Sequence, residues 1–310
     1  MRRIQYHRYG GPEVLRLEGF EPRQPRPDEV LIRVRAASAN PMDWKIRDGM
    51  MRMLTGGTFP RGLGTDFAGV VEAVGPDVTR LRVGDEVLGG TTPQEAGSFA
   101  DTVTADERGV VKKPPSISFE EAAALPTVGI TAYQAIIDQG SVEPGQTVFV
   151  HGCLGGVGRA AVQFALSRGA TVSGSCRPTA LADARALGVD PIVGFDFDAR
   201  GLAGRFDLVL DTAGTLSPHA LLTMTRPDGQ ILDINPSPAK FPTGTVPGAY
   251  RVLIAQAVTA DLEAVADAAA KKALQVPIAR TVALGEAIAA LQELEVAHTP
   301  KGGKLVVGSG

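Results

Sequence analysis

One stretch of the sequence indicates the fold most directly, namely Val148-Phe149-Val150-His151-Gly152-Cys153-Leu154-Gly155-Gly156-Val157-Gly158-Arg159. An apolar run leads into a glycine-rich segment, and helical spacing of apolar residues follows. In the pattern G-x-G-x-x-G, the glycines allow a tight turn, approach of the backbone to a pyrophosphate, and close packing of helix on strand. Cys153 replaces the first glycine, whereas Gly155 and Gly158 retain the other two roles. The stretch therefore predicts a strand, a phosphate-binding loop and a helix whose first N–H groups face an anion. A glycine-rich turn without a ligand is the alternative.

The chain around this stretch alternates strands and helices. The apolar periodicity predicts strands at 147–151, 171–175, 192–195, 207–211, 230–234 and 252–258, and helices at 158–168, 179–187, 218–225 and 260–274. That order is typical of an α/β domain with a doubly wound parallel sheet covered by helices on both faces.

The segments before and after this α/β region have a different character. Short strands separated by Gly and Pro turns are expected within 30–35, 68–74, 83–90, 98–104 and 109–112, which indicates a β-rich sandwich or partly open barrel. Ser118 followed by Glu121 is typical of a helix start. The last segment predicts a helix at 285–294 and a strand at 304–307.

Composition excludes several classes of protein. The chain has 310 residues, 44% of them hydrophobic and 21% charged, with a net charge of −3. This argues against a disordered chain and against a nucleic-acid binder that relies on a basic excess. The N-terminus has no apolar signal-peptide region, and the longest uncharged stretch, 122–137, is too short to span a bilayer, so a cytoplasmic location is expected. Cys153 and Cys176 are the only cysteines, which rules out a disulfide framework and a four-thiolate zinc site.

The end of the second predicted strand indicates which nucleotide binds. An acidic side chain at this place binds the ribose 2′-hydroxyl of NAD. Here the sequence is Ser173-Gly174-Ser175-Cys176-Arg177, without a carboxylate. Ser175 can donate a hydrogen bond, and the planar guanidinium of Arg177 suits a phosphate, so we predict NADP(H) rather than NAD(H). The alternative is that Arg177 is an ordinary solvated arginine.

Several further motifs carry a family resemblance. They are ANPMDWK (39–45), GTDFAGVV (64–71), VGDEV (83–87), LPTVGITAY (125–133), the glycine loop, DTAG (211–214) and GKLVV (303–307). In this order and spacing, the chain resembles the zinc-independent medium-chain dehydrogenases/reductases of the quinone oxidoreductase type, which includes the NADPH:quinone reductases and zeta-crystallin.

The resemblance implies an organisation, an activity and a set of site residues. It implies a GroES-like catalytic domain formed by residues 1–121 and 275–310, with a Rossmann NADP(H)-binding domain, 122–274, inserted between them. It implies hydride transfer from NADPH to a quinone or α,β-unsaturated carbonyl, and a homodimer through the edge strand 252–258. The cofactor residues expected from the residues and the resemblance together are Asn40, Thr127, Thr131, Gly155, Gly156, Val157, Gly158, Ser175, Arg177, Ala213, Ile234 and Asn235.

The chain departs from related branches at defined positions. Zinc-dependent relatives bind the metal through a cysteine near the Asn40 segment and a histidine in the segment around Thr65, and neither residue type is present there, so no metal site is expected. Enoyl-thioester reductases use a tyrosine in the loop equivalent to 47–54, which here has none. Phe195 stands where relatives often have a tyrosine that helps to hold the 2′-phosphate.

Three points stay open at this stage. Asn40 is either a turn cap or a polar contact at the nicotinamide, and Asp43 is read as a surface residue rather than a proton relay. No catalytic acid is assigned, and the proton could come from water or a cofactor ribose hydroxyl. A zinc-type alcohol dehydrogenase with unusual ligands and a non-catalytic NADPH-binding sensor or structural protein remain the alternative functions.

Overall fold

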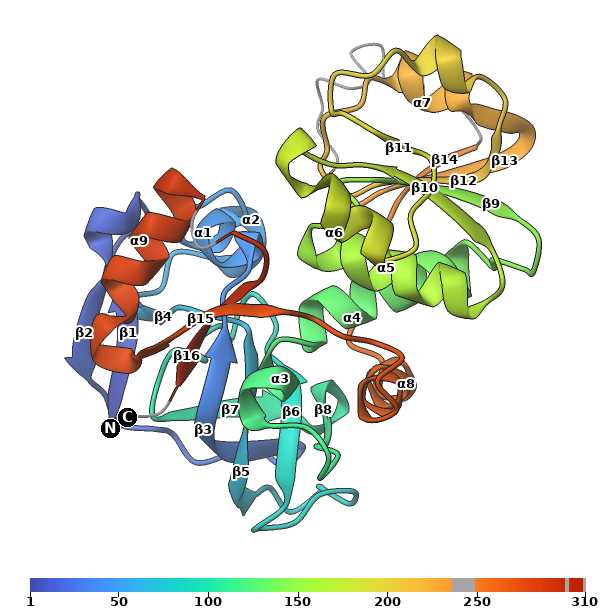
Figure 1. Cartoon of the computed structure of the whole chain (residues 1–310). Coiled ribbons are helices and arrows are strands. Elements are labelled where there is room, and N and C mark those ends of the chain that lie inside the picture. The colour runs from blue at the N-terminus through green and yellow to red at the C-terminus, as the bar shows by residue number, and fades with distance from the viewer. Residues whose placement is uncertain (236–248, 299–300, 309–310) are drawn as a thin grey trace. The chain divides into compact units, whose positions relative to one another are not determined.

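The structure, a computed structural model, describes residues 1–235, 249–298 and 301–308. The chain divides into two compact units (Figure 1). The first consists of Met1–Thr127, Ala257–Lys272 and Val276–Gly310, and the second of Val128–Gln256 and Ala273–Gln275. Helix α4 (Pro126–Tyr133) begins in the first unit and ends in the second. Among the described residues, no helix combines the length and the apolar character needed to cross a membrane.

The first unit is rich in β-strands. Its strands are β1 (Arg2–Tyr6), β2 (Arg16–Gly19), β3 (Glu29–Ser38), β4 (Arg61–Gly62), β5 (Asp66–Val74), β6 (Glu86–Gly90), β7 (Thr102–Asp106), β8 (Val110–Lys112), β15 (Ile278–Ala283) and β16 (Lys304–Gly308). Its helices are η1 (Pro12–Val14), α1 (Pro41–Arg47), α2 (Arg52–Thr55), η2 (Glu107–Gly109), α3 (Phe119–Ala123), α8 (Thr259–Ala270), η7 (Leu284–Glu286) and α9 (Ala287–Ala297).

The strands of the first unit form two sheets. One has the order β2-β1-β4, and the other runs β15-β16-β3-β5-β6-β8, with β7 also paired to β3. Strand β16, from the end of the chain, pairs antiparallel with β3 and so completes a sheet built mostly from N-terminal residues. Side chains of both sheets, including Ile4, Ile32 and Phe67, share one apolar core with Ala287 and Leu291 of α9.

The second unit contains the predicted parallel sheet. Its elements are η3 (Gln134–Gln139), β9 (Thr147–His151), α5 (Gly156–Ser167), β10 (Thr171–Ser175), η4 (Pro178–Ala180), α6 (Leu181–Ala186), β11 (Ile192–Val193), η5 (Ala199–Leu202), β12 (Phe206–Asp211), α7 (Pro218–Met224), β13 (Thr225–Asp233) and β14 (Tyr250–Val252). The strand order is β11-β10-β9-β12-β13-β14, and all neighbours are parallel. Numbered from β9, this is the order 3-2-1-4-5-6 of dinucleotide-binding sheets, which confirms the predicted fold class. Figure 1 shows α5 and α6 on one side of the sheet and α7 on the other.

The strand predicted at 252–258 is wrong. Strand β14 ends at Val252, and residues 253–258 are not in a strand. The side-chain amide of Gln134 accounts for this: it donates to the carbonyl of Gln256 at 2.9 Å and accepts from the N–H of Gln256 at 3.1 Å. Because a side chain satisfies both backbone groups, the segment has partners outside the sheet although its composition favours a strand.

The compact units also differ from the expected boundaries at 121/122 and 274/275. Residues 122–127 and helix α8 group with the first unit. Helix α8 contacts β8, and the hydroxyl of Thr259 donates to the carbonyl of Arg108 at 2.8 Å. An alanine-rich helix directly after the α/β region does not reveal from sequence which unit it packs on.

Candidate functional site

The glycine loop lies in the second unit, between β9 and α5. Gly152 has a φ of +80°, which favours glycine. A Cβ atom on Gly158 would lie 2.2 Å from the carbonyl oxygen of Gly152, so only glycine lets the helix approach the loop this closely. Gly155 is the N-cap of α5 and provides no side chain to accept from the first turn. The loop therefore leaves the first N–H groups of a 12-residue helix open to an anion, as the pyrophosphate of a dinucleotide requires.

Ser175 helps to shape this loop from the neighbouring strand. Its hydroxyl oxygen accepts from the N–H of Gly152 at 3.0 Å and lies 2.7 Å from Nδ1 of His151. His151 in turn lies 2.7 Å, through Nε2, from the hydroxyl of Thr215. Ser175 and His151 are both fully buried. The predicted contact of Ser175 with a cofactor stays a prediction, whereas its contacts within the protein tie β10 to the loop.

Arg177 lies just beyond the end of β10 and is exposed. Its guanidinium forms no ion pair with another residue of the described ranges 1–235, 249–298 and 301–308. Phe195 lies against His151 with a ring centroid distance of 5.1 Å. Arg177 thus places a cation beside the strand end, whereas Phe195 offers no hydroxyl to a 2′-phosphate, and the preference for NADP(H) stays a prediction.

Two buried carboxylates organise the loops predicted at the nicotinamide end. Asp211 accepts from the N–H of Gly214 at 2.7 Å and shapes the turn that contains Ala213. Asp233, its neighbour across β12 and β13, accepts from the N–H of Asn235 at 2.7 Å and from the hydroxyl of Tyr250 at 2.6 Å. Burial, together with that hydrogen bond, raises the pKa of Tyr250. Ala213, Ile234 and Asn235 therefore follow adjacent strands at the carboxyl edge of the sheet, where open α/β sheets bind ligands.

A second polar centre lies in the first unit, at one end of the central strands of its larger sheet. The C-terminal end of β3 and the first residues of β5 and β16 meet there, because β3 pairs antiparallel with both. We call Asn40, Asp43, Thr65, Asp66, Thr127 and Lys304 the buried polar cluster. Asn40, Asp43 and Asp66 are each 1% exposed and Lys304 8%.

The hydrogen bonds of the cluster centre on Asn40 and Asp66. The Asn40 amide donates to Asp66 Oδ2 at 3.0 Å and accepts from Lys304 Nζ at 2.5 Å. Asp66 Oδ1 accepts from the hydroxyl of Thr127 at 2.6 Å, and Oδ2 accepts from the N–H of Thr127 at 3.1 Å. Asp43 accepts from the N–H of Asn40 at 2.7 Å and from the hydroxyl of Thr65 at 3.3 Å. Both ends of the Asn40 amide are therefore engaged within the protein.

Burial changes the acidity of the ionisable groups in this cluster. It raises the pKa of Asp43 from the ordinary value of 3.8 to about 7, against the opposing effect of the hydrogen bond from Asn40. It also raises the pKa of Asp66 and lowers that of Lys304. Opposite charges nearby counteract each of these shifts, so the cluster sets the amine of Lys304 against the carboxyl groups of Asp43 and Asp66.

The structure corrects the sequence interpretation of Asp43, which is buried rather than on the surface. The polar cluster as a whole was also missed. Two signals pointed to it: Asp43 follows three residues after the Asn40 helix start, and Lys304 opens a strand of Leu and Val. A lysine in such a strand either emerges at an edge or faces a buried carboxylate.

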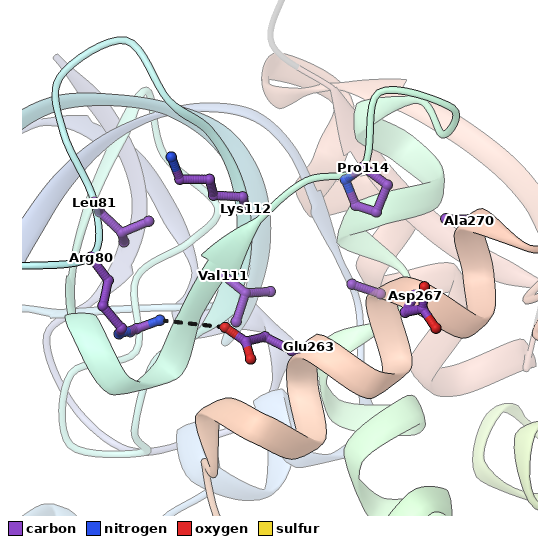
Figure 2. A pocket seen from close by; sticks show the side chains of 9 residues that line it. Arg80, Leu81, Val111, Lys112, Pro114, Glu263, Asp267 and Ala270 are labelled. Atoms are coloured by element: carbon purple, nitrogen blue, oxygen red, sulfur yellow. Dashed lines mark ion pairs between the residues drawn. The ribbon is translucent and has the colours of Figure 1, made fainter.

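A separate pocket of about 560 Å³ in the first unit contains none of the predicted site residues. It is lined by Arg80, Leu81, Val111, Lys112, Pro114, Glu263, Ala266, Asp267 and Ala270. Figure 2 shows Glu263 projecting from α8 toward Arg80, with which it forms an ion pair. Its charged groups already have partners: Arg80 lies 4.0 Å from Glu263, Lys112 pairs with Asp85, and Asp267 pairs with Lys271.

Both cysteines lie inside the second unit, away from solvent. Cys153 and Cys176 are buried, and burial raises the pKa of the Cys153 thiol to about 12, which fits small packing residues. Within the described parts of the chain, no three His, Cys, Asp or Glu residues are grouped to hold a metal ion. Independence of zinc stays a prediction.

Comparison with known proteins identifies the family. Residues 26–115 match the alcohol dehydrogenase GroES-like domain, and residues 187–307 match a family described as zinc-binding dehydrogenase. A chloroplastic quinone-oxidoreductase homologue of Spinacia oleracea is 30% identical over 254 residues, which cover 78% of this chain and 77% of that protein. The chain belongs to the quinone oxidoreductase-like medium-chain dehydrogenases/reductases.

Solved structures of the same family share the whole fold. The quinone oxidoreductase from Coxiella burnetii is similar with a TM-score of 0.90 and 30% identity, over 100% of this chain and 99% of that one. The quinone oxidoreductase from Pseudomonas syringae pv. Tomato DC3000 is similar with a TM-score of 0.83 and 30% identity, over 99% of both chains. The first unit therefore contains a GroES-like domain and the second is Rossmann-like, and the chain is an oxidoreductase of a family that uses a nicotinamide cofactor.

Proposed function

We propose that this oxidoreductase uses NADPH to reduce a quinone or an α,β-unsaturated carbonyl, without zinc. The observation that carries the cofactor assignment is the uncapped first turn of α5, followed at the end of β10 by the exposed Arg177 in place of a carboxylate. The substrate class is supported by the names of the relatives. The cofactor supplies a hydride at C4 of its nicotinamide when bound.

Each predicted residue has a defined role in this proposal. The N–H groups of Gly156, Val157 and Gly158 bind the pyrophosphate, and Arg177 binds the 2′-phosphate. Gly155, whose own N–H donates to the carbonyl of Gly152 at 2.9 Å, lets the backbone approach the pyrophosphate because it has no side chain. The hydroxyl of Ser175 holds the loop in place by accepting a hydrogen bond from the N–H of Gly152. On the family resemblance, we assign six residues to the nicotinamide end, namely Asn40, Thr127, Thr131, Ala213, Ile234 and Asn235.

The proposal is tested by turnover with defined substrates. NADPH oxidation is followed at its absorbance band with a panel of quinones and enones and compared with NADH. Faster oxidation with NADPH and at least one acceptor supports the assignment. NADPH binding with background turnover across the whole panel would instead favour the non-catalytic alternative.

Replacing Arg177 by alanine should separate the two cofactors. We expect the Kd for NADPH to rise about 10- to 100-fold, since a charge-assisted hydrogen bond contributes about 1.5–3 kcal/mol, while the Kd for NADH stays unchanged. Nucleotide fluorescence titration measures both. Arg200→Ala is the matched control, because Arg200 is an exposed arginine of the same unit that pairs with Asp198. Equal weakening of NADPH and NADH by Arg177→Ala would contradict the assignment.

A chelator should not affect this activity. Asn40 and Thr65 stand at the places where zinc-dependent relatives carry thiolate and imidazole ligands, so we expect EDTA treatment and dialysis to leave the rate within about twofold. Loss of activity on chelation, restored by added Zn²⁺, would revive the alcohol dehydrogenase alternative.

A homodimer and a cytoplasmic location remain parts of the proposal. Strand β14 occupies the edge of the parallel sheet and replaces the longer predicted strand as the pairing surface. Sedimentation equilibrium of the wild type and of a Val252→Pro variant in β14 tests the dimer, because the N–H of Val252 alternates with those that face β13 and points to the outer edge, where proline removes it. We expect the variant to sediment as a monomer, and an unchanged dimer would contradict pairing through β14.

A further inference from the structure

One carboxylate connects two of the residues proposed for the nicotinamide end. The carboxylate of Asp66 accepts a hydrogen bond from the side-chain amide of Asn40 at 3.0 Å. It accepts two more from Thr127, one from the hydroxyl at 2.6 Å and one from the N–H at 3.1 Å. Asn40 precedes α1, and Thr127 lies in the first turn of α4, so the two residues come from separate helices. We propose that Asp66 is a positioning residue, which holds Asn40 and Thr127 in the single arrangement that receives the nicotinamide. This inference rests on the proposed function.

The hydrogen bonds require an acceptor at this place. Asn40 Nδ2, the Thr127 hydroxyl and the Thr127 N–H all donate toward Asp66, and an ionised carboxylate is the side chain that accepts all three without a donor of its own. An asparagine with its oxygen in the place of Oδ2 would keep the bonds from Asn40 and from the Thr127 N–H, but its NH₂ group would donate to the Thr127 hydroxyl and reverse that hydrogen bond. The substitution therefore preserves side-chain volume, but it removes the negative charge that faces Lys304 and turns the Thr127 hydroxyl from donor to acceptor.

Charge balance explains how the carboxylate remains buried. Lys304 supplies the basic group of the cluster, and its Nζ donates a hydrogen bond to Oδ1 of Asn40. The same Asn40 side chain donates through Nδ2 to Asp66. The other titratable group that faces Asp66 is Asp43, whose proton occupancy adjusts the total charge. Thr65 can donate to ionised Asp43 or accept from its protonated form, so the cluster tolerates both states. A purely structural site could use apolar residues at less cost, which favours a role for these polar groups.

The experiment compares two probes that share the adenosine end of the cofactor. NADPH carries the nicotinamide, and 2′-phospho-ADP-ribose lacks it. For Asp66→Asn we expect the Kd for NADPH to rise about tenfold or more, while the Kd for 2′-phospho-ADP-ribose stays within about twofold. A merely structural role would not distinguish the two probes. The unfolding temperature is recorded for every variant.

Thr127 provides the test if Asp66→Asn fails to fold. Thr127→Val is isosteric and removes only the hydroxyl that donates to Asp66, whereas Thr127→Ser retains it. We expect Thr127→Val to weaken NADPH about three- to tenfold with no effect on 2′-phospho-ADP-ribose, and Thr127→Ser to restore wild-type affinity. Glu29→Gln is the control, because Glu29 is a buried carboxylate of the same unit that pairs with Arg23 and touches none of the proposed nicotinamide residues.

The outcomes separate this inference from the proposed function. Selective loss of NADPH affinity in Asp66→Asn or Thr127→Val supports the positioning role. Equal change for both probes, or no change for either, in a folded variant overturns it while the wild type still binds NADPH. A wild type that binds neither probe overturns the proposed function, and the positioning role with it.

Discussion

Replacing Gly158 by alanine is expected to lower NADPH affinity by at least about 100-fold, corresponding to about 2.7 kcal/mol. The added Cβ would lie 2.2 Å from the carbonyl oxygen of Gly152 and 3.1 Å from Cα of Cys153, and both are backbone atoms. Because the loop cannot yield as a side chain would, α5 must move away from the loop. That movement displaces the N–H groups that bind the pyrophosphate and costs a further 1–3 kcal/mol or so of stability.

Gly201→Ala is the matched control for this variant. Gly201 lies in η5 of the same unit, and a Cβ there meets no atom within 4 Å. We expect its unfolding temperature and NADPH affinity to match the wild type, as measured by thermal unfolding and fluorescence titration. If Gly158→Ala bound NADPH as well as Gly201→Ala, the close approach of loop and helix would have no part in cofactor binding.

The features that sequence predicted best depend on local patterns. The glycine loop and the parallel strands that flank it follow from apolar runs, turn residues and helix starts, all of which lie within short stretches of the chain. The capping of α3 is an example: Ser118 accepts from the N–H of Glu121, and Glu121 accepts from the N–H of Ser118, as the spacing predicts.

The errors arise where distant segments decide the structure. Residues 253–258 have the composition of a strand, yet Gln134, more than a hundred positions away, binds the backbone of Gln256. Burial of Asp43 likewise requires β5 and β16 to meet the end of β3, and no local pattern specifies that meeting. The antiparallel pairing of β3 with both β5 and β16 brings Asp66 and Lys304 together, and the sequence alone does not specify that pairing.

The buried polar cluster also bears on the relation to zinc-dependent relatives. The segments around Asn40 and Thr65 are those in which such relatives carry metal ligands. Here the Lys304 ammonium supplies a positive charge that binds Asn40 and faces Asp66. An amine on β16 has no open coordination position, so it can orient neighbouring side chains but cannot coordinate a substrate oxygen as a catalytic zinc does.

The final prediction concerns the pH dependence of stability that Asp43 produces. Its pKa in the folded protein, about 7, lies above the ordinary 3.8, so the folded state binds the proton more tightly than the unfolded state. The stabilisation from this proton is complete below about pH 4 and is lost as the pH rises toward about 7. The pKa difference corresponds to about 4 kcal/mol in the free energy of unfolding.

Asp43→Asn should remove this dependence, because asparagine resembles the protonated acid in shape and charge and its NH₂ group can donate to Thr65. Chemical denaturation between about pH 4.5 and pH 9 gives the free energy of unfolding of both proteins. We expect the variant to gain stability relative to the wild type as the pH rises, with the gain levelling off above about pH 7. Asp196→Asn, at an exposed position of the second unit, controls for loss of a carboxylate and should run parallel to the wild type. A constant difference between Asp43→Asn and the wild type across this range would mean that Asp43 is ionised throughout, and that the cluster carries two negative charges around one ammonium.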